Sequence, residues 1–251
     1  MIVLKSPREI ALMREAGRVV VAAQRLCREL SRPGVSTLEI DQEVEGLIRK
    51  AGARPAFKGY RGFPATVCAS INEEVVHGIP AAHRRLKEGD IVGLDLGAVV
   101  EGYYADAAFT LAIGEIPPEV QRLLDVTRES LELAIQQGRP GNRLGDVSAA
   151  VQRRVEAAGF GVVRAFVGHG IGRELHEDPQ VPNFGEPGKG PLLRAGMVLA
   201  IEPMVTMGHW EVRVLADRWT AVTEDGSLAA HFEHTVAITA DGPDVLTWEA
   251  A

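Results

Sequence analysis

Two aspartates near the middle of this sequence lie in surroundings that favour a bound cation. Asp95 lies in the apolar stretch 91–97, where an unpaired carboxylate would be costly to bury. Asp106 lies on the strand that returns after a turn near Glu101. Whether the turn centres on residues 100–101 or 101–102, both carboxylates point to one face, within about 5 to 8 Å of each other. Two like charges this close need a cation, a shared proton or a basic partner, although two solvated aspartates in a hairpin are the simpler alternative.

Three further residues extend this pair to a set that could bind metal. Glu202 lies 107 residues after Asp95 in a second apolar strand, and Glu233 is the counterpart of Asp106 if the second hairpin carries an insertion. His169 lies between glycines that disfavour a helix and allow close approach of backbone and ligand. Four carboxylates and one imidazole are the donors that two divalent cations take. Such a pair, about 3.5 to 4 Å apart, would hold a hydroxide between them.

The other histidines are assigned by their local sequence. His77 lies where a strand passes into a turn and His176 follows His169 by seven residues, so each could support the site or be structural. His234 should face away from Glu233 on a strand. The remaining three are expected at the surface or in turns: His83, His209 and His231.

A repeat of 107 residues organises the elements that would position these side chains. Arg-Pro-Gly occurs at 32–34 and again at 139–141, and the segment 86–92 matches 193–199 at the same displacement. A constant displacement through separate anchors predicts a duplication. We expect one domain spanning residues 1–251, with halves of about 1–112 and 113–251.

Helical and strand patterns alternate within each half. Apolar spacing and capping residues predict helices over 7–30, 37–50, 118–137 and 144–158. Strands are expected over 67–76, 91–111, 162–167, 198–205 and 232–239. The order predicts an α/β sandwich of two pseudo-symmetric halves, with mostly antiparallel strands inside and helices outside.

Composition excludes several other classes of protein. The chain has 251 residues, a formal net charge of −7 and 46% hydrophobic residues, which is ordinary for a globular protein. The acidic balance argues against binding nucleic acid or an anionic membrane. No apolar run approaches the length of a membrane span, and the first ten residues do not form a secretory signal. Two cysteines do not make a disulfide framework, so we expect a cytoplasmic protein.

Several motifs together resemble the type I methionine aminopeptidases. They are Tyr60-Arg61-Gly62-Phe63-Pro64-Ala65-Thr66-Val67-Cys68, Ile71-Asn72-Glu73, His77-Gly78-Ile79-Pro80, Gly168-His169-Gly170-Ile171-Gly172, Ile201-Glu202-Pro203 and Phe232-Glu233-His234-Thr235. The resemblance covers nearly the whole chain. It implies the α/β (α+β) pita-bread fold, in which two pseudo-symmetric halves place a central antiparallel sheet inside outer helices. It also implies a two-metal site whose ligands are Asp95, Asp106, His169, Glu202 and Glu233.

The resemblance further implies what each side chain does. Asp106 and Glu233 would bridge both metals, Glu202 would also be the general base, and His77 and His176 would contact the substrate. The implied activity removes the N-terminal methionine from newly made proteins whose second residue is small, through a metal-bridging hydroxide. The methionine pocket would be walled by Tyr60, Phe63, Cys68, His77 and Trp219, which could otherwise be ordinary core. The chain departs from common family usage at Phe57, Arg61, Val76 and Leu175.

Cofactors, partners and rival functions follow from the same resemblance. The donor set suits Co, Mn, Fe, Zn or Ni equally, and a monovalent cation near Asn72 is compatible with the family. The expected partners are the N-termini of nascent polypeptides. A transient contact with the ribosome would be consistent with such substrates. We expect the protein to bind no nucleic acid of its own and no membrane, and to be a monomer. The alternatives are an Xaa-Pro dipeptidase or aminopeptidase, whose chains usually carry an N-terminal domain, and a non-catalytic pita-bread binding protein.

Overall fold

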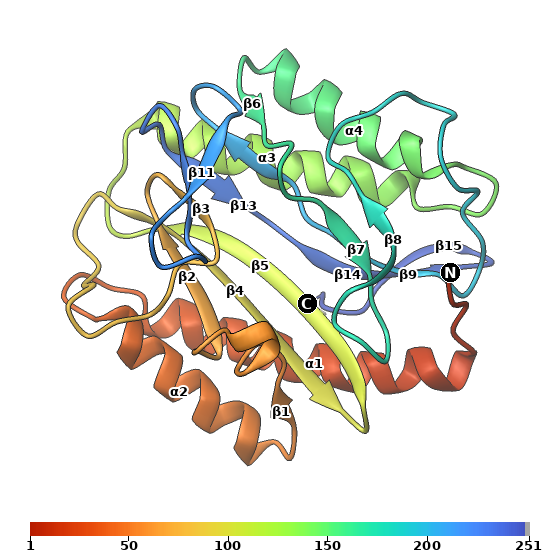
Figure 1. Cartoon of the computed structure of the whole chain (residues 1–251), viewed down its shortest axis with the longest axis horizontal. Helices are drawn as coiled ribbons and strands as arrows, with labels where there is room; N and C mark the ends of the chain where they lie inside the picture. The colour runs from red at the N-terminus through yellow and green to blue at the C-terminus, as the bar shows by residue number, and fades with distance from the viewer. Residues whose placement is uncertain (249–251) are drawn as a thin grey trace.

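Two pairs of α-helices enclose the strands (Figure 1). A computed structural model describes residues 1–248, in which the α-helices are α1 (Pro7–Leu30), α2 (Thr37–Lys50), α3 (Pro118–Gln137) and α4 (Leu144–Ala157). In Figure 1, α1 and α2 lie on one side of the strands, and α3 and α4 lie on the other. The predicted helix bounds are confirmed, with α4 ending one residue early. Among the helices described within residues 1–248, none combines the length and the hydrophobicity of a transmembrane span.

Side-chain caps fix where the first two helices begin. The Ser6 hydroxyl accepts a hydrogen bond from the Glu9 N–H at 3.4 Å, and the Glu9 carboxylate accepts one from the Ser6 N–H at 2.8 Å. Ser36 and Glu39 repeat this reciprocal arrangement at the start of α2, at 3.2 and 2.8 Å. Each box satisfies two N–H groups that a helix start would otherwise leave without partners.

The strands form short antiparallel sheets between the helix pairs. The first half contains β1 (Arg54–Pro55), β2 (Val67–Ile71), β3 (Glu74–Val76), β4 (Ile91–Val100) and β5 (Tyr103–Ala112), with a 3-10 turn at Tyr60–Gly62. The second half contains β6 (Gly161–Val162), β7 (Gly168–Gly170), β8 (Glu177–Val181), β9 (Val198–Ile201), β10 (Met204–Thr206), β11 (Val212–Val214), β12 (Ala221–Thr223), β13 (Ala229–His231), β14 (His234–Thr239) and β15 (Gly242–Val245). The sheet orders are β1-β4-β2 with β5 on β4, β13-β10-β6, β11-β12-β3 and β15-β14-β9-β7-β8.

One predicted strand is interrupted and another is shortened at an acidic residue. The predicted strand 198–205 is divided into β9 and β10 around Glu202 and Pro203. The predicted strand 232–239 starts only at His234, as β14, because Phe232 and Glu233 belong to no strand and separate β14 from β13. The pairs Ile201–His234 and Met204–His231 keep one register across this break, which places Glu202 opposite Glu233. Pro203 has no N–H to donate, so the ladder opens there. The predicted strand 162–167 is also wrong beyond β6, because the chain has no strand between Val162 and Gly168.

The displacement of 107 residues seen in the sequence recurs in the structure. It separates the whole of α2 from α4, and the first residues of β1 and β4 from those of β6 and β9. It also separates two isolated bridges, Ser36–Arg85 and Arg143–Leu192. Equivalent segments of the two halves therefore have equivalent local structure. The single domain and its boundaries stay predictions.

Hydrogen bonds across the seam between the halves set the relative position of two acidic residues. They link Thr110 with His231, Ala108 with Glu233, and Asp106 with Thr235. The Thr235 hydroxyl donates to the Asp106 carbonyl at 2.8 Å and accepts from the Asp106 N–H at 2.9 Å. One side chain thus satisfies both backbone groups of a buried residue on the other half.

Replacing Thr235 with Val is expected to lower the free energy of unfolding by about 2 kcal/mol or more. The change leaves a buried N–H and a buried carbonyl of Asp106 without partners, and each such group costs about 1 to 3 kcal/mol. Urea unfolding of the metal-free protein measures this. Thr239→Val is the matched control, because the Thr239 hydroxyl also donates to one backbone carbonyl, that of Gly242, and accepts from one N–H, that of Asp241, but at a partly exposed strand end. Equal effects of the two substitutions would contradict the role of Thr235.

Candidate metal centre

The β4–β5 hairpin places Asp95 and Asp106 on one face. Val100 pairs with Tyr103, so the turn is Glu101–Gly102, and Asp106 pairs with Gly97 while Asp95 pairs with Ala108. The register is thus the second of the two predicted, with the aspartates as diagonal neighbours. Both turn residues have positive φ, 48° and 82°, as the tight hairpin turn that matches strand twist requires.

The second half supplies Glu202 and His169 from adjacent strands. Glu202 follows the last residue of β9, and His169 on β7 pairs with Ala200 of β9. Their side chains approach to 3.5 Å between His169 Nε2 and Glu202 Oε1. His169 Nδ1 lies 2.9 Å from the Gly170 carbonyl. With Nδ1–H donating to that carbonyl, Nε2 is left with a lone pair directed into the site.

The glycines on either side of His169, Gly168 and Gly170, are required by close packing of the backbone. A Cβ at Gly168 would lie 2.3 Å from the Ala200 carbonyl oxygen, and one at Gly170 would lie 2.1 Å from the Asp178 carbonyl oxygen. The strands on either side of His169 can therefore approach only because both positions lack a side chain. This close approach places the imidazole beside the acidic residues.

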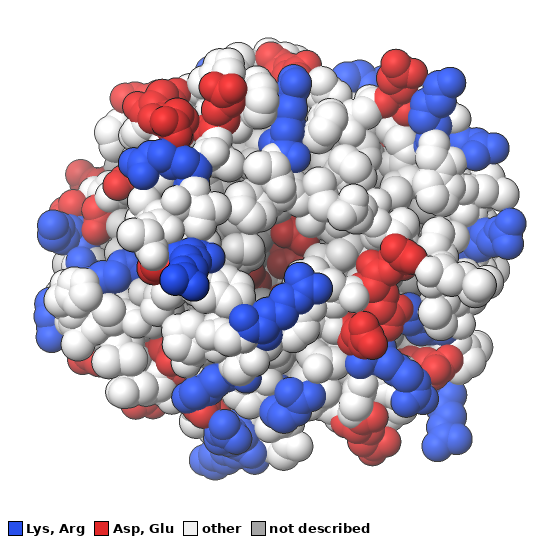
Figure 2. All heavy atoms as spheres, in the orientation of Figure 1, with Lys and Arg blue, Asp and Glu red and all other residues white. Residues whose placement is uncertain are grey.

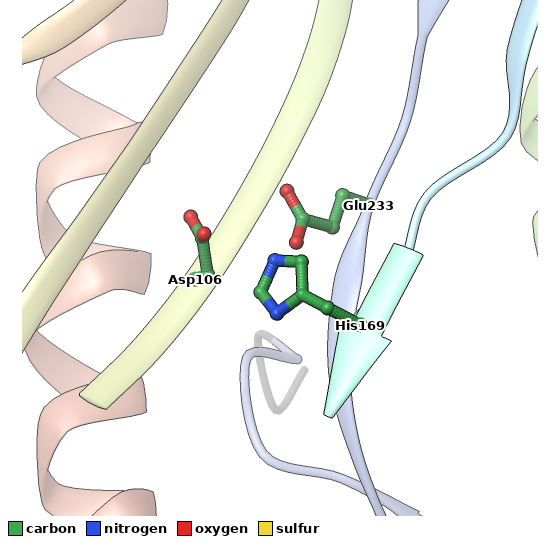
Figure 3. A group of neighbouring side chains, drawn as sticks. All are labelled: Asp106, His169 and Glu233. Carbon is green, nitrogen blue, oxygen red and sulfur yellow. The ribbon is translucent and has the colours of Figure 1, made fainter. Parts of the chain in front are cut away.

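Three of these side chains already form a cluster of the size of a metal site (Figure 3). Each of Asp106, His169 and Glu233 offers one ligand atom, and these atoms lie within 4.8 Å of one another. Figure 3 shows Asp106 on β5, and it shows the side chains of His169, from β7, and Glu233, from the segment between β13 and β14, extending toward that strand. All five residues predicted as ligands line one cavity of about 180 Å³.

Buried carboxylate oxygens without partners support a bound cation. Asp95 Oδ1, Asp106 Oδ1 and Glu233 Oε1 are buried and accept no hydrogen bond from residues 1–248. Buried polar atoms are almost always satisfied, so three unpartnered acceptors in one cavity are exceptional. The residues present therefore fit divalent cations, which would supply the missing interactions.

The same burial changes the pKa values of the cluster. Burial raises the pKa of Asp106 from 3.8 to about 7, and burial with the neighbouring charges of Asp106 and Glu202 raises the pKa of Glu233 well above its usual range. Burial and the charge of Asp106 do the same to Glu202. The pKa of His169 falls to about 4, because burial disfavours the imidazolium form. The metal-free cluster thus tends toward protonated acids and a neutral imidazole.

Metal affinity is expected to rise steeply with pH between 6 and 8. Cations bind the carboxylate form, and the proton held by Asp106 near its pKa of about 7 must leave first. Each proton released gives about a tenfold change in affinity per pH unit below that pKa. Calorimetric titration with Mn²⁺ in two buffers of different ionisation enthalpy would detect the released protons. Heats and affinities independent of buffer and pH would contradict this prediction.

One prediction about the histidines is wrong. His231 was expected at the surface or in a turn, but it is buried at 3% exposure and its Nε2 lies 3.6 Å from Glu202 Oε2. Its Nε2 has no hydrogen-bond partner in the part of the chain that the structure describes. Glu202 is therefore flanked by two imidazoles, His169 and His231. His83 and His209 are exposed as predicted, and His234 lies on the other face, with Nδ1 3.0 Å from the Thr247 hydroxyl.

Apolar and aromatic side chains wall the rest of the cavity. The residues predicted for the methionine pocket all line it: Tyr60, Phe63, Cys68, His77 and Trp219. So do the four positions that depart from family usage: Phe57, Arg61, Val76 and Leu175. Sequence analysis missed Phe166, whose ring meets the His77 ring edge-on at 5.5 Å between centroids.

A stack of rings lies on the open side of the cavity. The Tyr60 hydroxyl lies 2.8 Å from His176 Nδ1, and the two rings stack at 5.2 Å. The His176 ring in turn lies 4.2 Å from the His169 ring. His77 has a backbone φ of 61° directly after β3, and burial lowers its pKa to about 4, so its imidazole is neutral. Of the two histidines, His176 thus lies beside the metal cluster, next to His169, and His77 lies beside the aromatic wall.

The fold and this cluster define a metal-dependent peptidase. The model of metallopeptidase family M24 matches residues 11–240, and the chain belongs to that family. A methionine aminopeptidase of Clostridium acetobutylicum is 53% identical over 98% of this chain and 99% of its own length. The crystal structure of methionine aminopeptidase from Thermotoga maritima matches with a TM-score of 0.98 at 53% identity, over 99% of this chain and 100% of that one. Within family M24, the chain therefore groups with the methionine aminopeptidases, which confirms the predicted resemblance and pita-bread fold.

The comparison with prolidases argues against the rival enzyme. The prolidase from Pyrococcus horikoshii matches with a TM-score of 0.80 at 25% identity, and this chain covers only 64% of its length. The shared part is the fold described above. The higher identity to methionine aminopeptidases therefore favours that activity over that of an Xaa-Pro peptidase.

Proposed function

We propose that the protein hydrolyses the first peptide bond of polypeptides that begin with methionine and have a small second residue. The observation that carries this proposal is the cluster of Asp106, His169 and Glu233 in a cavity whose remaining wall is apolar and aromatic. The cluster would hold the metal, and the wall would hold an unbranched thioether side chain. The names of the similar proteins point to the same substrate.

The metal is proposed as a pair of divalent ions held by Asp95, Asp106, His169, Glu202 and Glu233. When bound, such ions activate water and polarise the scissile carbonyl. Asp106 on β5 and Glu233 between β13 and β14 come from different halves of the chain, and the family resemblance implies that both would help to hold both ions. An oxygen and nitrogen donor set of this kind does not select among Co, Mn, Fe, Zn and Ni.

The chain's own residues would orient the substrate and move its protons. The aromatic wall fixes the methionine side chain, so that only the first peptide bond reaches the acidic cluster. With the Tyr60 hydroxyl donating to His176 Nδ1, the His176 Nε2 carries the hydrogen and can donate to the developing oxyanion. Glu202 takes a proton from the attacking water and delivers it to the leaving amine. His77 closes the methionine side of the cavity beside Trp219, at 6.2 Å between ring centroids.

The finer expectations about cofactors and partners are proposals too. We infer that the substrates are nascent polypeptide N-termini in the cytoplasm, which is compatible with two buried free cysteines. A transient ribosome contact, a monomeric state and a monovalent cation beside Asn72 remain predictions. The Asn72 carbonyl accepts from the Ala229 N–H at 2.9 Å, and its side chain bonds to Asp90 and Ile91. A cation there would have to share these oxygens.

Release of free methionine from Met-Ala-Ser tests the proposed function. We expect release by the metal-loaded protein, loss on chelation, and recovery when Mn²⁺, Fe²⁺, Co²⁺, Zn²⁺ or Ni²⁺ is restored. Ala-Pro is the comparison substrate. Faster hydrolysis of Ala-Pro would support an Xaa-Pro peptidase, and binding of peptide without hydrolysis under every metal would support a binding protein.

A further inference from the structure

A second cavity opens directly beside the metal centre. It has a volume of about 740 Å³ and shares four lining residues with the site cavity: Arg61, Val167, His169 and His176. Figure 2 shows a recess near the middle of the displayed face, with Asp or Glu atoms (red) at its base and Lys or Arg side chains (blue) at its rim. A peptide whose first bond lies at the metal cluster would leave the site through this shared opening, so we call the second cavity the exit groove.

Most charges that line the exit groove are already paired. The ion pairs are Met1 N-terminus–Asp178, Lys5–Glu177 and, at 3.9 Å, Arg173–Glu9. Of the charged residues lining the groove, only Arg61 and Glu174 make no ion pair within residues 1–248. Arg61 lines both cavities, whereas Glu174 lines only the exit groove. Arg61 is therefore the unpaired charge nearer to the reacting bond.

The backbone holds Arg61 at this place in an unfavourable conformation. Its φ of 48° and ψ of 23° lie in the left-handed region, and Gly59 and Gly62 on either side have φ values of 87° and 90°. The turn is fixed by hydrogen bonds from the Gly59 N–H to the Phe63 carbonyl and from the Phe63 N–H to the Tyr60 carbonyl, at 2.8 and 2.9 Å. Glycine at position 61 would remove the strain. A strained arginine in such a turn points to a use for its side chain.

The position of Arg61 indicates which substrate residue it would meet. Its Cζ lies 5.3 Å from the centre of the Tyr60 ring, which contacts His176, whose ring lies beside His169. Arg61 is thus separated from the metal cluster by the ring stack. The proposed function puts the first residue of the substrate in the aromatic cavity and requires a small second residue. The third residue is then the first whose side chain is long enough to reach the rim.

We propose that Arg61 is a specificity-determining residue that favours an acidic side chain at the third position of the substrate. The proposal rests on the proposed function. A carboxylate at that position would pair with the guanidinium, and a lysine would be repelled by it. Because the pair would be exposed, the effect is modest and sensitive to salt, about fivefold between glutamate and lysine at low ionic strength.

Competition among three peptides measures this preference. They are Met-Ala-Glu-Ser, Met-Ala-Gln-Ser and Met-Ala-Lys-Ser, and the readout is the ratio of kcat/KM for the Glu and Lys peptides within each protein variant. Because each variant is compared with itself, a general change of activity or folding cancels. We expect a ratio of about five in 50 mM KCl that approaches one in 500 mM KCl.

Two substitutions at Arg61 and one matched control complete the test. Arg61→Gln should bring the ratio close to one, and Arg61→Glu should invert it. Arg218→Gln is the control, because Arg218 is an exposed arginine that also has positive φ, 67°, and lines neither cavity. A ratio that is unchanged by both Arg61 substitutions, or that Arg218→Gln moves equally, overturns the proposal. Failure of the wild-type protein to cleave Met-Ala-Gln-Ser would instead refute the proposed function.

Discussion

Glu202→Gln is expected to lower kcat for Met-Ala-Ser by about 10²- to 10⁴-fold while the protein keeps its fold. Glutamine has nearly the same shape but cannot accept a proton. Glu202 lies between the imidazoles of His169 and His231, at 3.5 and 3.6 Å. Burial and the charge of Asp106 raise the pKa of Glu202 well above its usual range, so the carboxyl can hold a proton on its way to the leaving amine.

The measurement must separate proton transfer from metal binding, because Glu202 is also a proposed ligand. Steady-state kinetics give kcat and KM, and metal analysis of the same sample gives the bound stoichiometry. Loss of kcat with metal retained supports proton transfer by Glu202. Loss of metal in proportion to activity would show that Glu202 acts only as a metal ligand. Full activity of the variant would refute both roles.

The aspartate pair was predictable because the β-hairpin leaves few registers. Only two turn positions were compatible with the sequence around Glu101, and both put Asp95 and Asp106 on one face. The choice between them depends on whether Glu101 adopts a positive φ. A glutamate before a glycine does not reveal this in advance, since residues other than glycine adopt a positive φ only rarely.

The breaks at Glu202 and Glu233 were harder to foresee than the acids themselves. The repeat located Glu202 and suggested Glu233, but apolar patterns on both sides predicted unbroken strands. Only the pairing of β9 with β14 and β10 with β13 shows that the two glutamates lie opposite each other. Such long-range register is not encoded in local spacing.

His231 could have been found, and Arg61 could not. On a strand, residues two apart share a face, so His231 belonged on the same side as Glu233. Its apolar neighbours, Ala229 and Ala230, were a further sign of burial. For Arg61 the sequence shows only that this position departs from common family usage. That it lacks an ion pair at the opening of two cavities depends on where Glu9, Glu177 and Asp178 find their partners.

Asp106→Asn is expected to abolish metal binding and activity and yet to stabilise the metal-free protein. Asp106 contributes one of the three clustered ligand atoms, and its neutral amide would bind a divalent cation far less strongly. In the metal-free protein, the substitution removes a buried negative charge next to Asp95, Glu202 and Glu233, whose pKa values its charge helps to raise.

The sign and the pH range of the stabilisation follow from linkage. The pKa of Asp106 is about 7 in the folded chain and about 3.8 when unfolded, so the folded state binds more protons between these values. Stability of the metal-free wild type therefore falls as pH rises from about 4 through 7, and the penalty is complete above pH 7. The variant lacks this penalty. Its gain should be about 2 kcal/mol or more at pH 8 and should vanish near pH 4.

Thermal unfolding with and without metal checks both halves of this prediction. At pH 8 with EDTA, the variant should unfold several degrees above the wild type. Addition of Mn²⁺ should raise the Tm of the wild type by mass action and leave that of the variant unchanged. Asp90→Asn is a useful comparison, because Asp90 accepts hydrogen bonds from Asn72 and Lys87 outside the cluster. It should lower stability and preserve the response to metal. If Asp106→Asn destabilised the metal-free protein at pH 8, the four acids could not be mutually repelling, and the main physical reason for placing cations among them would be lost.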